Sequence, residues 1–386
     1  MTGGGSGGHI TPILAVAAEL KKQLPDARLV YIGQRGDRLS DIPAADPSID
    51  VVYSVSAGKF RRYKSDGIKQ IFDLKTQALN LRDLFRMLAG IWQSFWLLRR
   101  LRPELIFTRG GFVSVPVAVA GRLSGIPYIT HDSDALPSLA NRLIASGARL
   151  HAVALPAHTY PYPQDKIVVT GVPVSQKYHP VTAANQAAAR EKLEIARDAR
   201  VLLVTGGGNG AAALNHHIVT ASKELFAAVP ELFILHVAGR NLADTTAADY
   251  DNLLTAEQRQ KVRVVGFTTD LYLFSEAADV VVARGGATNL AEFAIQGRAC
   301  LIIPSPQLHW NVVNARVLAE QGAVEMLSEK KVAEQGGALV DVLSALLNNA
   351  DARQKLAANI TQFGQPTAAK NLADVLISLV RESAKQ

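Results

Sequence analysis

Short apolar runs alternate with longer amphipathic stretches along the whole of this 386-residue chain. The short runs are rich in Val, Ile and Leu, and many of them stop at glycine or at a polar residue. Continuous apolar runs of this kind are typical of parallel strands buried on both faces, and the stretches between them have helical spacing. We therefore expect strands at residues 28–32, 50–55, 105–108, 128–130, 151–154, 167–170, 200–205, 232–238, 262–265, 280–283 and 299–303.

This alternation predicts an α/β fold with doubly wound parallel sheets, and the pattern occurs twice. A strand, a glycine-rich loop and the start of a helix follow one another at residues 200–212, and the loop and helix at residues 3–22 echo them. We expect two Rossmann-like domains, at residues 1–170 and 171–365. The amphipathic helix within residues 366–386 is expected to pack back on the first domain.

The first glycine-rich loop has almost nothing in front of it. Only Met1 and Thr2 precede Gly3, whereas such a loop normally follows a buried strand of about five residues. We expect the first strand of the N-terminal domain to be missing or truncated. The alternative is a loop that caps a helix without a parent strand.

The composition is that of a globular protein, with 48% hydrophobic and 19% charged residues. Cys300 is the one cysteine, so no disulfide can form within the chain, which fits a reducing compartment. The chain starts without the pattern of a signal peptide, and no apolar stretch approaches about 18 residues. We therefore expect neither a secretory leader nor a transmembrane helix.

The formal net charge of +7 favours an anionic partner: nucleic acid, an acidic membrane surface or a phosphorylated substrate. Residues 59–102 carry eleven Lys or Arg side chains against three acidic ones. Large apolar residues are interleaved with them at helical spacing. They either pack on the sheet or place a basic, aromatic helix at an anionic bilayer, and both can hold for different faces.

Residues 278–315 have the pattern of a nucleotide-sugar site. The strand 280–283 leads into the small-residue loop 284–288 and a helix at 289–296, whose free N–H groups suit a phosphate. Glu292, one turn into that helix, is placed to reach two adjacent ribose hydroxyls. The loop 305–311 after the next strand would lie beside it. The alternative is an ordinary βαβ unit without a ligand.

Neither glycine loop has the dinucleotide spacing or the Lys-Ser/Thr ending of a P-loop, which disfavours dehydrogenases and NTPases. His9 at the first loop either bonds the backbone, or acts as a general base or as a hydrogen-bond donor close to a phosphate. The strand end at residues 131–134 is a second candidate site. Its Asp132 and Asp134 are weak evidence for a metal site, because two spaced acids on a turn are common. No cluster of His and Cys has the spacing of metal ligands. We expect no metal and no cofactor.

A series of motifs runs through nearly the whole chain. In order they are GGSGGH (4–9), GGFVSVP (110–116), GIPYITHDSD (125–134), GVPV (171–174), GGGNGAAALN (206–215), GFTTD (266–270), RGGATNLAE (284–292) and HWNVVNA (309–315). Together they resemble the MurG family within glycosyltransferase family 28, the UDP-N-acetylglucosamine:lipid I N-acetylglucosaminyltransferases.

The resemblance implies a GT-B architecture, with two Rossmann-like domains facing across a cleft. It implies inverting, metal-independent transfer of N-acetylglucosamine from UDP-N-acetylglucosamine to lipid I, an undecaprenyl diphosphate, which forms lipid II in peptidoglycan synthesis. The protein would be peripheral on the cytoplasmic face of the plasma membrane, bound through residues 59–102, with no nucleic acid partner. A lipid glycosyltransferase with a diacylglycerol-type acceptor, a UDP-N-acetylglucosamine 2-epimerase and an inactive UDP-sugar-binding homologue stay open.

The resemblance also implies roles for single residues. His9 is the expected general base, with Asp132 as its rival. Ala287 and Thr288 would hold the diphosphate, and Glu292 the ribose. Thr268 would contact uracil through its backbone, and Asn311 would approach the sugar. The full set of expected substrate-binding residues is Ser6, Gly7, Gly8, Phe112, His131, Asp134, Ser175, Gly208, Asn209, Thr268, Arg284, Ala287, Thr288, Glu292, Trp310 and Asn311.

The chain departs from the family pattern at a few of these positions. Gly208-Asn209 stands where Ser-Gln is usual, and Ser175 stands where the connector commonly ends in Arg. Asp-Ser-Asp follows His131 in place of Glu-Gln-Asn, and Trp310-Asn311 replaces a Gln pair. Gly208 and Ser175 each remove a side chain that could bind the donor. The donor sugar and the acceptor contacts therefore stay open.

Overall fold

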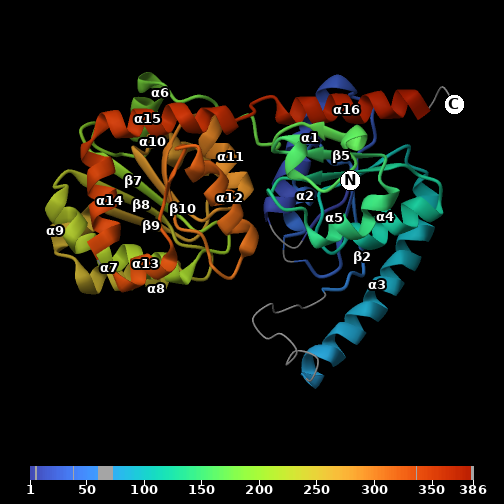
Figure 1. Cartoon of the computed structure of the whole chain (residues 1–386), viewed down its shortest axis with the longest axis horizontal. Coiled ribbons are helices and arrows are strands. Elements are labelled where there is room, and N and C mark those ends of the chain that lie inside the picture. Colours follow the sequence, from blue (N-terminus) through green and yellow to red (C-terminus); the bar gives the residue numbers. More distant parts are fainter. Residues whose placement is uncertain (5–6, 38, 60–72, 336, 384–386) are drawn as a thin grey trace. The chain divides into compact units, whose positions relative to one another are not determined.

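The computed structural model divides into two compact units, each built around its own parallel sheet (Figure 1). Unit 1 comprises Met1–Ser175 and Thr367–Gln386, and unit 2 comprises Gln176–Pro366. The predicted α/β class with two Rossmann-like parallel sheets is confirmed. The residues that the structure describes are 1–4, 7–37, 39–59, 73–335 and 337–383.

In unit 1 every strand pair is parallel, in the orders β1-β2 and β3-β4-β5-β6. Parallel neighbours need long crossovers, which helices supply. The strands are β1 (Val30–Gln34), β2 (Val51–Val55), β3 (Ile106–Thr108), β4 (Tyr128–Asp132), β5 (Leu150–Val153) and β6 (Ile167–Val169). The helices are α1 (Gly7–Gln23), α2 (Asp41–Ala44), α3 (Leu74–Leu101), α4 (Ser114–Leu123), α5 (Leu139–Ile144) and α16 (Ala368–Ser383).

Thr2, together with the backbone of Met1, joins the two parts of this sheet. It forms parallel bridges to Ile32 of β1 and to Thr108 of β3. Its amide donates to the Phe107 carbonyl at 2.9 Å, and its hydroxyl donates to the Ile32 carbonyl at 2.9 Å. Thr2 therefore lies where the sequence predicts a missing or truncated strand, directly before the first glycine loop.

The strands of unit 1 bury apolar side chains on both faces. On one face α1 packs beside α16 (Figure 1), with Ile10 and Leu372 in the same buried cluster. On the other face α3 packs against α4, with Leu98 and Val117 in a second cluster. Successive strand residues point to opposite faces, so β1, β2, β3 and β4 each contribute to both clusters.

Unit 2 has one sheet in the order β12-β11-β10-β7-β8-β9, again entirely parallel. Its central strands are buried along almost their whole length, which explains their continuous apolar sequences. The strands are β7 (Arg200–Thr205), β8 (Leu232–Val237), β9 (Val262–Val265), β10 (Val280–Ala283), β11 (Ala299–Ile302) and β12 (Glu325–Met326).

The helices of unit 2 cover both faces of this sheet, around two buried clusters. They are α6 (Ala183–Lys192), α7 (Ala212–Ala228), α8 (Ala243–Leu253), α9 (Ala256–Gln260), α10 (Leu271–Ala277), α11 (Ala287–Gln296), α12 (His309–Glu320), α13 (Glu329–Glu334), α14 (Gly337–Asn348) and α15 (Ala350–Ile360).

The structure differs from the sequence-based expectation at a few boundaries. The strand β12 was not expected, because two residues at a sheet edge leave no apolar run. The strand β4 continues to Asp132, so His131 and Asp132 belong to the sheet and not to the loop after it. The helix α11 begins at Ala287, which makes Ala287 and Thr288 its first residues. In the described part of the chain, no helix combines the length and apolar character needed to cross a bilayer.

Truncation of Leu372 tests the packing of α16 on α1. Its side chain is fully buried, so Leu372→Ala should lower the free energy of unfolding of unit 1 by about 2–5 kcal/mol. Urea unfolding followed by circular dichroism measures the change. Glu382→Ala, an exposed position on the same helix, should change it by less than about 0.5 kcal/mol. Equal effects of the two variants would contradict this packing.

Candidate functional site

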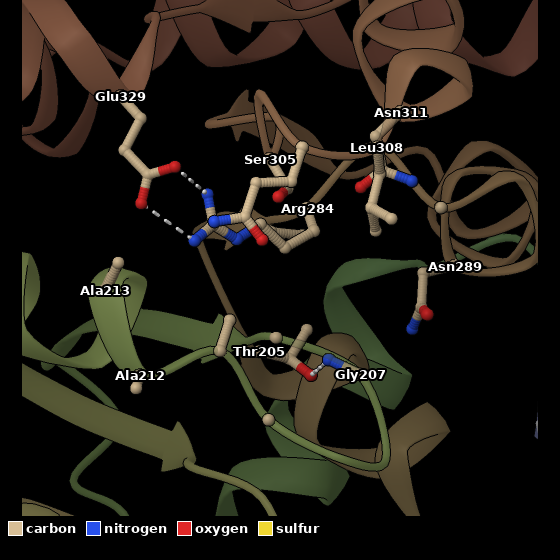
Figure 2. A pocket seen from close by; sticks show the side chains of 16 residues that line it. Thr205, Gly207, Ala212, Ala213, Arg284, Asn289, Ser305, Leu308, Asn311 and Glu329 are labelled. Carbon is tan, nitrogen blue, oxygen red and sulfur yellow. Dashed lines mark hydrogen bonds and ion pairs between the residues drawn. The ribbon is translucent and has the colours of Figure 1, made fainter. Parts of the chain in front are cut away.

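A pocket of about 510 Å³ lies in unit 2, at the carboxyl ends of β7, β10 and β11 (Figure 2). Open parallel sheets bind ligands at this edge. The pocket is lined by the loops that follow these strands and by the first residues of α7, α11 and α12, with Glu329 of α13 at its edge. The loop from Thr205 to Ala212 lies across the pocket from Arg284 and Ser305 in Figure 2.

Three helices thus start at one pocket, and none of them has a polar cap. The N-cap residues Ala211, Gly286 and Leu308 make no side-chain capping bond, and no acidic residue lies in any of the three first turns. The first N–H groups of a helix have no partner within the helix, and its dipole places a partial positive charge there. The pocket is therefore suited to an anion such as a diphosphate.

Glycines allow these loops to approach one another closely. A Cβ at Gly285 would lie 2.2 Å from the Asn311 carbonyl oxygen, so the start of α12 packs directly on the loop before α11. Gly210 has a φ of +74°, and a Cβ there would lie 2.0 Å from the Ala238 carbonyl oxygen. Glycine is required at both positions, because any side chain would separate the loops.

Arg284 is the one cation among the residues that line the pocket, and its charge is already compensated. Its Nη2 lies 3.2 Å from Glu329 Oε1, and its Nη1 donates to the Ile303 carbonyl at 2.9 Å (Figure 2). Both side chains are largely buried. The guanidinium therefore holds the start of α13 against the end of β11.

Glu292 lies one turn beyond the pocket lining on α11, with Tyr178 over it. Burial raises the pKa of Glu292 to about 8, and the hydrogen bond from the Tyr178 hydroxyl opposes that rise. The same contact and burial raise the pKa of Tyr178. Sequence reasoning missed Tyr178, because the segment after the connector has no motif and lies far from Glu292 along the chain.

The predicted donor residues take several positions around the pocket. Arg284 and the buried Asn311 line it. Thr268 accepts a hydrogen bond from the Asp270 amide at 2.9 Å, and Trp310 is 44% exposed in the first turn of α12. The predicted residues that do not line the pocket are Gly208, Asn209, Thr268, Ala287, Thr288, Glu292 and Trp310.

In unit 1, His9 lies at the start of α1 against the loop after β3. Its Nδ1 is 3.1 Å from the Arg109 carbonyl oxygen. A carbonyl only accepts hydrogen bonds, so Nδ1 carries the proton and Nε2 keeps its lone pair. Burial, together with the positive charge of Arg109, lowers the pKa of His9 to about 4, against the effect of that hydrogen bond. The ring is thus neutral at pH 7.

Asp132 is buried, and both of its carboxylate oxygens have partners. Tyr162 donates its hydroxyl to Oδ2 at 2.8 Å, and the Ser138 amide donates to Oδ1 at 3.0 Å. Burial raises the pKa of Asp132, while the Tyr162 hydrogen bond lowers it. The Tyr162 ring stacks on His151 at 3.8 Å. These contacts hold the carboxylate in the interior of unit 1.

Arg109 connects this region electrostatically. Its Nη2 donates to the Gly8 carbonyl at 3.3 Å. Burial lowers its pKa to about 10, and the charges of Asp134 and Asp132 oppose that shift. Sequence reasoning did not single out Arg109, although a signal was present: β3 and β10 are each followed by Arg-Gly-Gly, at residues 109–111 and 284–286.

The other predicted residues of unit 1 are more scattered. His131 is fully buried, with Nε2 2.9 Å from the Gly171 carbonyl oxygen. The Phe112 ring lies 5.5 Å from the Lys59 ammonium, and Ser175 is exposed at the end of the unit. Ser6 lies outside the described residues, and Gly7 begins α1. Across the described ranges, no group of three or more His, Cys, Asp or Glu residues is arranged to hold a metal ion.

Comparison with known sequences gives matches over both units. Residues 1–152 match the glycosyltransferase family 28 N-terminal domain, and residues 201–372 match the family 28 C-terminal domain. A protein of Moorella thermoacetica is 30% identical over 392 residues, covering 98% of each chain, and one of Natranaerobius thermophilus is 28% identical over 384 residues, covering 98% and 99%. Both are named UDP-N-acetylglucosamine–N-acetylmuramyl-(pentapeptide) pyrophosphoryl-undecaprenol N-acetylglucosamine transferase.

Solved structures share the fold. MurG of Acinetobacter baumannii superposes with a TM-score of 0.72 at 24% identity, covering 98% of each chain. A UDP-GlcNAc 2-epimerase of Neisseria meningitidis, bound to UDP-GlcNAc, has a TM-score of 0.63 at 14% identity, covering 98% of this chain and 99% of that one. At these identities the likeness concerns the architecture alone.

The environment of Glu292 predicts a pH-dependent stability. Its pKa is raised in the folded chain from 4.5 to about 8, so the folded state holds an extra proton between these values. The stability contributed by the protonated carboxyl is complete below pH 4.5 and is lost as the pH rises to about 8. In denaturant titrations at several pH values, Glu292→Gln should gain stability relative to wild type across this window. For the exposed control Glu320→Gln, the free energy of unfolding should vary with pH as it does in wild type. The same pH dependence in Glu292→Gln would refute the raised pKa of Glu292.

Proposed function

The chain belongs to glycosyltransferase family 28 and is a glycosyltransferase, and on that premise we propose that it transfers N-acetylglucosamine from UDP-N-acetylglucosamine to lipid I. Lipid I is the undecaprenyl diphosphate that carries N-acetylmuramyl-pentapeptide, and the product is lipid II of peptidoglycan synthesis. The observation that carries the proposal is the convergence of three uncapped helix starts on one pocket, in a chain of this family.

The donor binds in unit 2, with its diphosphate at the starts of α7, α11 and α12. During transfer the bond between the anomeric carbon and the diphosphate oxygen breaks, and negative charge grows on the leaving UDP. Fixed N–H groups directed at this charge stabilise it without reorganising. Ala287 and Thr288, which lie between the lining residues Gly286 and Asn289, supply backbone donors from α11. The carboxyl of Glu292, one turn further along, accepts from the ribose hydroxyls.

The acceptor diphosphate binds in unit 1 near the first glycine loop, where Gly8 and His9 lie. The acceptor hydroxyl attacks the anomeric carbon from the face opposite the leaving group, so the configuration inverts. Its proton passes to Nε2 of His9, which is the nitrogen with a lone pair. Asp132 is the weaker choice, because Tyr162 and Ser138 already engage both of its oxygens. The role of Asp132 is to hold this region of unit 1.

One face of α3 suits the surface of an acidic membrane. Leu81, Phe85, Leu88, Trp92 and Trp96 repeat at helical spacing, and each is more than half exposed. Basic residues accompany them on the same helix, and its first turns extend beyond the rest of unit 1 in Figure 1. We infer peripheral association with the cytoplasmic face of the plasma membrane through this stripe. Residues 60–72, part of the expected segment, lie outside the described residues.

Release of UDP by the purified chain tests the catalytic proposal. With UDP-N-acetylglucosamine and a short-chain lipid I analogue, His9→Ala should lower kcat by about 10²–10⁴-fold, with little change in KM, because it removes the base. His158→Ala, an exposed histidine of the same unit, should keep wild-type kcat. Release with diacylglycerol alone would assign another lipid acceptor. Epimerisation of the donor, or donor binding without turnover, would replace the proposal with the corresponding alternative.

The membrane proposal concerns the stripe on α3. The double variant Trp92→Ser with Trp96→Ser should weaken cosedimentation with phosphatidylglycerol vesicles at least tenfold, because two aromatic anchors are lost. Leu253→Ser removes an exposed apolar side chain from unit 2 and should leave binding unchanged. Vesicle binding that survives the double variant would show that another surface makes the contact.

A further inference from the structure

The pocket of unit 2 lacks a cation that is free to meet a diphosphate. Each helix start offers a partial charge of about half a unit. Among the residues that line the pocket, Arg284 alone is cationic, and Glu329 compensates it within 3.2 Å. A nucleoside diphosphate brings full negative charges, so a cation from a neighbouring position would complete its recognition.

Arg240 is such a cation, and it borders the glycine loop of the pocket. It follows Gly239, which lies against Gly210 so tightly that a Cβ on Gly239 would be 2.4 Å from the Gly210 Cα. Gly210 in turn lines the pocket. Arg240 is exposed, and within the described part of the chain no carboxylate is paired with it.

The guanidinium of Arg240 is held over an aromatic ring. Its Cζ lies 4.0 Å from the centre of the Phe267 ring, and Phe267 is 41% exposed. The same ring lies 3.5 Å from the position that a Cβ on Gly208 would take. Stacking on the ring fixes the plane of the guanidinium and leaves the N–H groups at its edge free to donate.

The backbone that carries Arg240 is itself anchored. Asn215 of α7 donates from Nδ2 to the Ala238 carbonyl at 2.9 Å, and its Oδ1 lies 3.1 Å from His236 Nε2. The other ring nitrogen of His236 is 3.0 Å from the Tyr250 hydroxyl. Gly239 then turns the chain with a φ of +104°. This network ties the loop of Arg240 to the same helix that starts at the pocket.

We propose that Arg240, stacked on Phe267, binds the diphosphate of the nucleotide-sugar donor from the side of the glycine loop. The inference rests on the proposed function and adds a donor-binding side chain to it. A planar guanidinium matches two phosphate oxygens at once, and it adds a full positive charge to the partial charges of the helix starts. The absence of a side chain at Gly208 leaves space beside the Phe267 ring for this ligand.

Binding of uridine, UMP and UDP to the full chain, measured by isothermal titration calorimetry, tests the proposal. Arg240→Ala should weaken UDP binding about tenfold or more, and uridine binding by less than twofold, because uridine lacks phosphate. The matched control is Arg263→Ala. Arg263 also lies over an aromatic ring, with its Cζ 5.8 Å from the centre of the Phe233 ring. The control variant therefore removes the same charge and the same kind of contact elsewhere in unit 2.

Each outcome has a separate meaning. Unchanged UDP affinity in Arg240→Ala would overturn the proposal, and so would equal losses for UDP and uridine, which would place Arg240 at the base. Equal losses of UDP affinity in Arg240→Ala and Arg263→Ala would show that only the net charge of the chain matters. That result would overturn the proposal too. A folded wild-type chain that binds no UDP would instead refute the proposed function itself.

Discussion

The positive ends of three helices meet at one edge of the sheet in unit 2, and the structure around them follows from that constraint. Their partial charges repel one another, so an arrangement without caps or acidic residues in the three first turns needs solvent or an anion between the helices. The parallel order β11-β10-β7 places all three helices on the same edge. Glycines at positions 210 and 285 bring the loops close enough to enclose a single pocket.

The two units contribute chemistry of different kinds. In unit 2 the residues at the starts of α7 and α11 are small, and the backbone itself presents the donors. In unit 1 the carboxyl ends of β3 and β4 carry the buried Arg109, His131 and Asp132, and the charge of Arg109 interacts with that of Asp132. A rigid array of N–H groups suits a leaving group whose charge grows, whereas a neutral histidine with a free lone pair suits proton removal.

The sequence predicted the strands other than β12, both glycine loops and the helix that starts near residue 287, because each depends on neighbours along the chain. It did not predict the partners of the site residues. Glu329 compensates Arg284 from 45 positions away, and Tyr178 reaches Glu292 from a segment without a motif. Tyr162 reaches Asp132 in the same way, across 30 positions. Such contacts depend on how distant segments pack, which local patterns do not record.

The sheet of unit 1 is connected only narrowly at Thr2, which lies between β1 and β3. Elsewhere in the sheet, neighbouring strands pair over several residues, whereas Met1 and Thr2 supply the backbone bonds described between β1 and β3. The helix α1 packs across this connection and stabilises it, since its Ile10 and Ile13 are buried with Tyr31 of β1 and Phe107 of β3. His9 belongs to the same helix and its ring bonds the Arg109 carbonyl after β3, so the position of the proposed base depends on how this junction is packed.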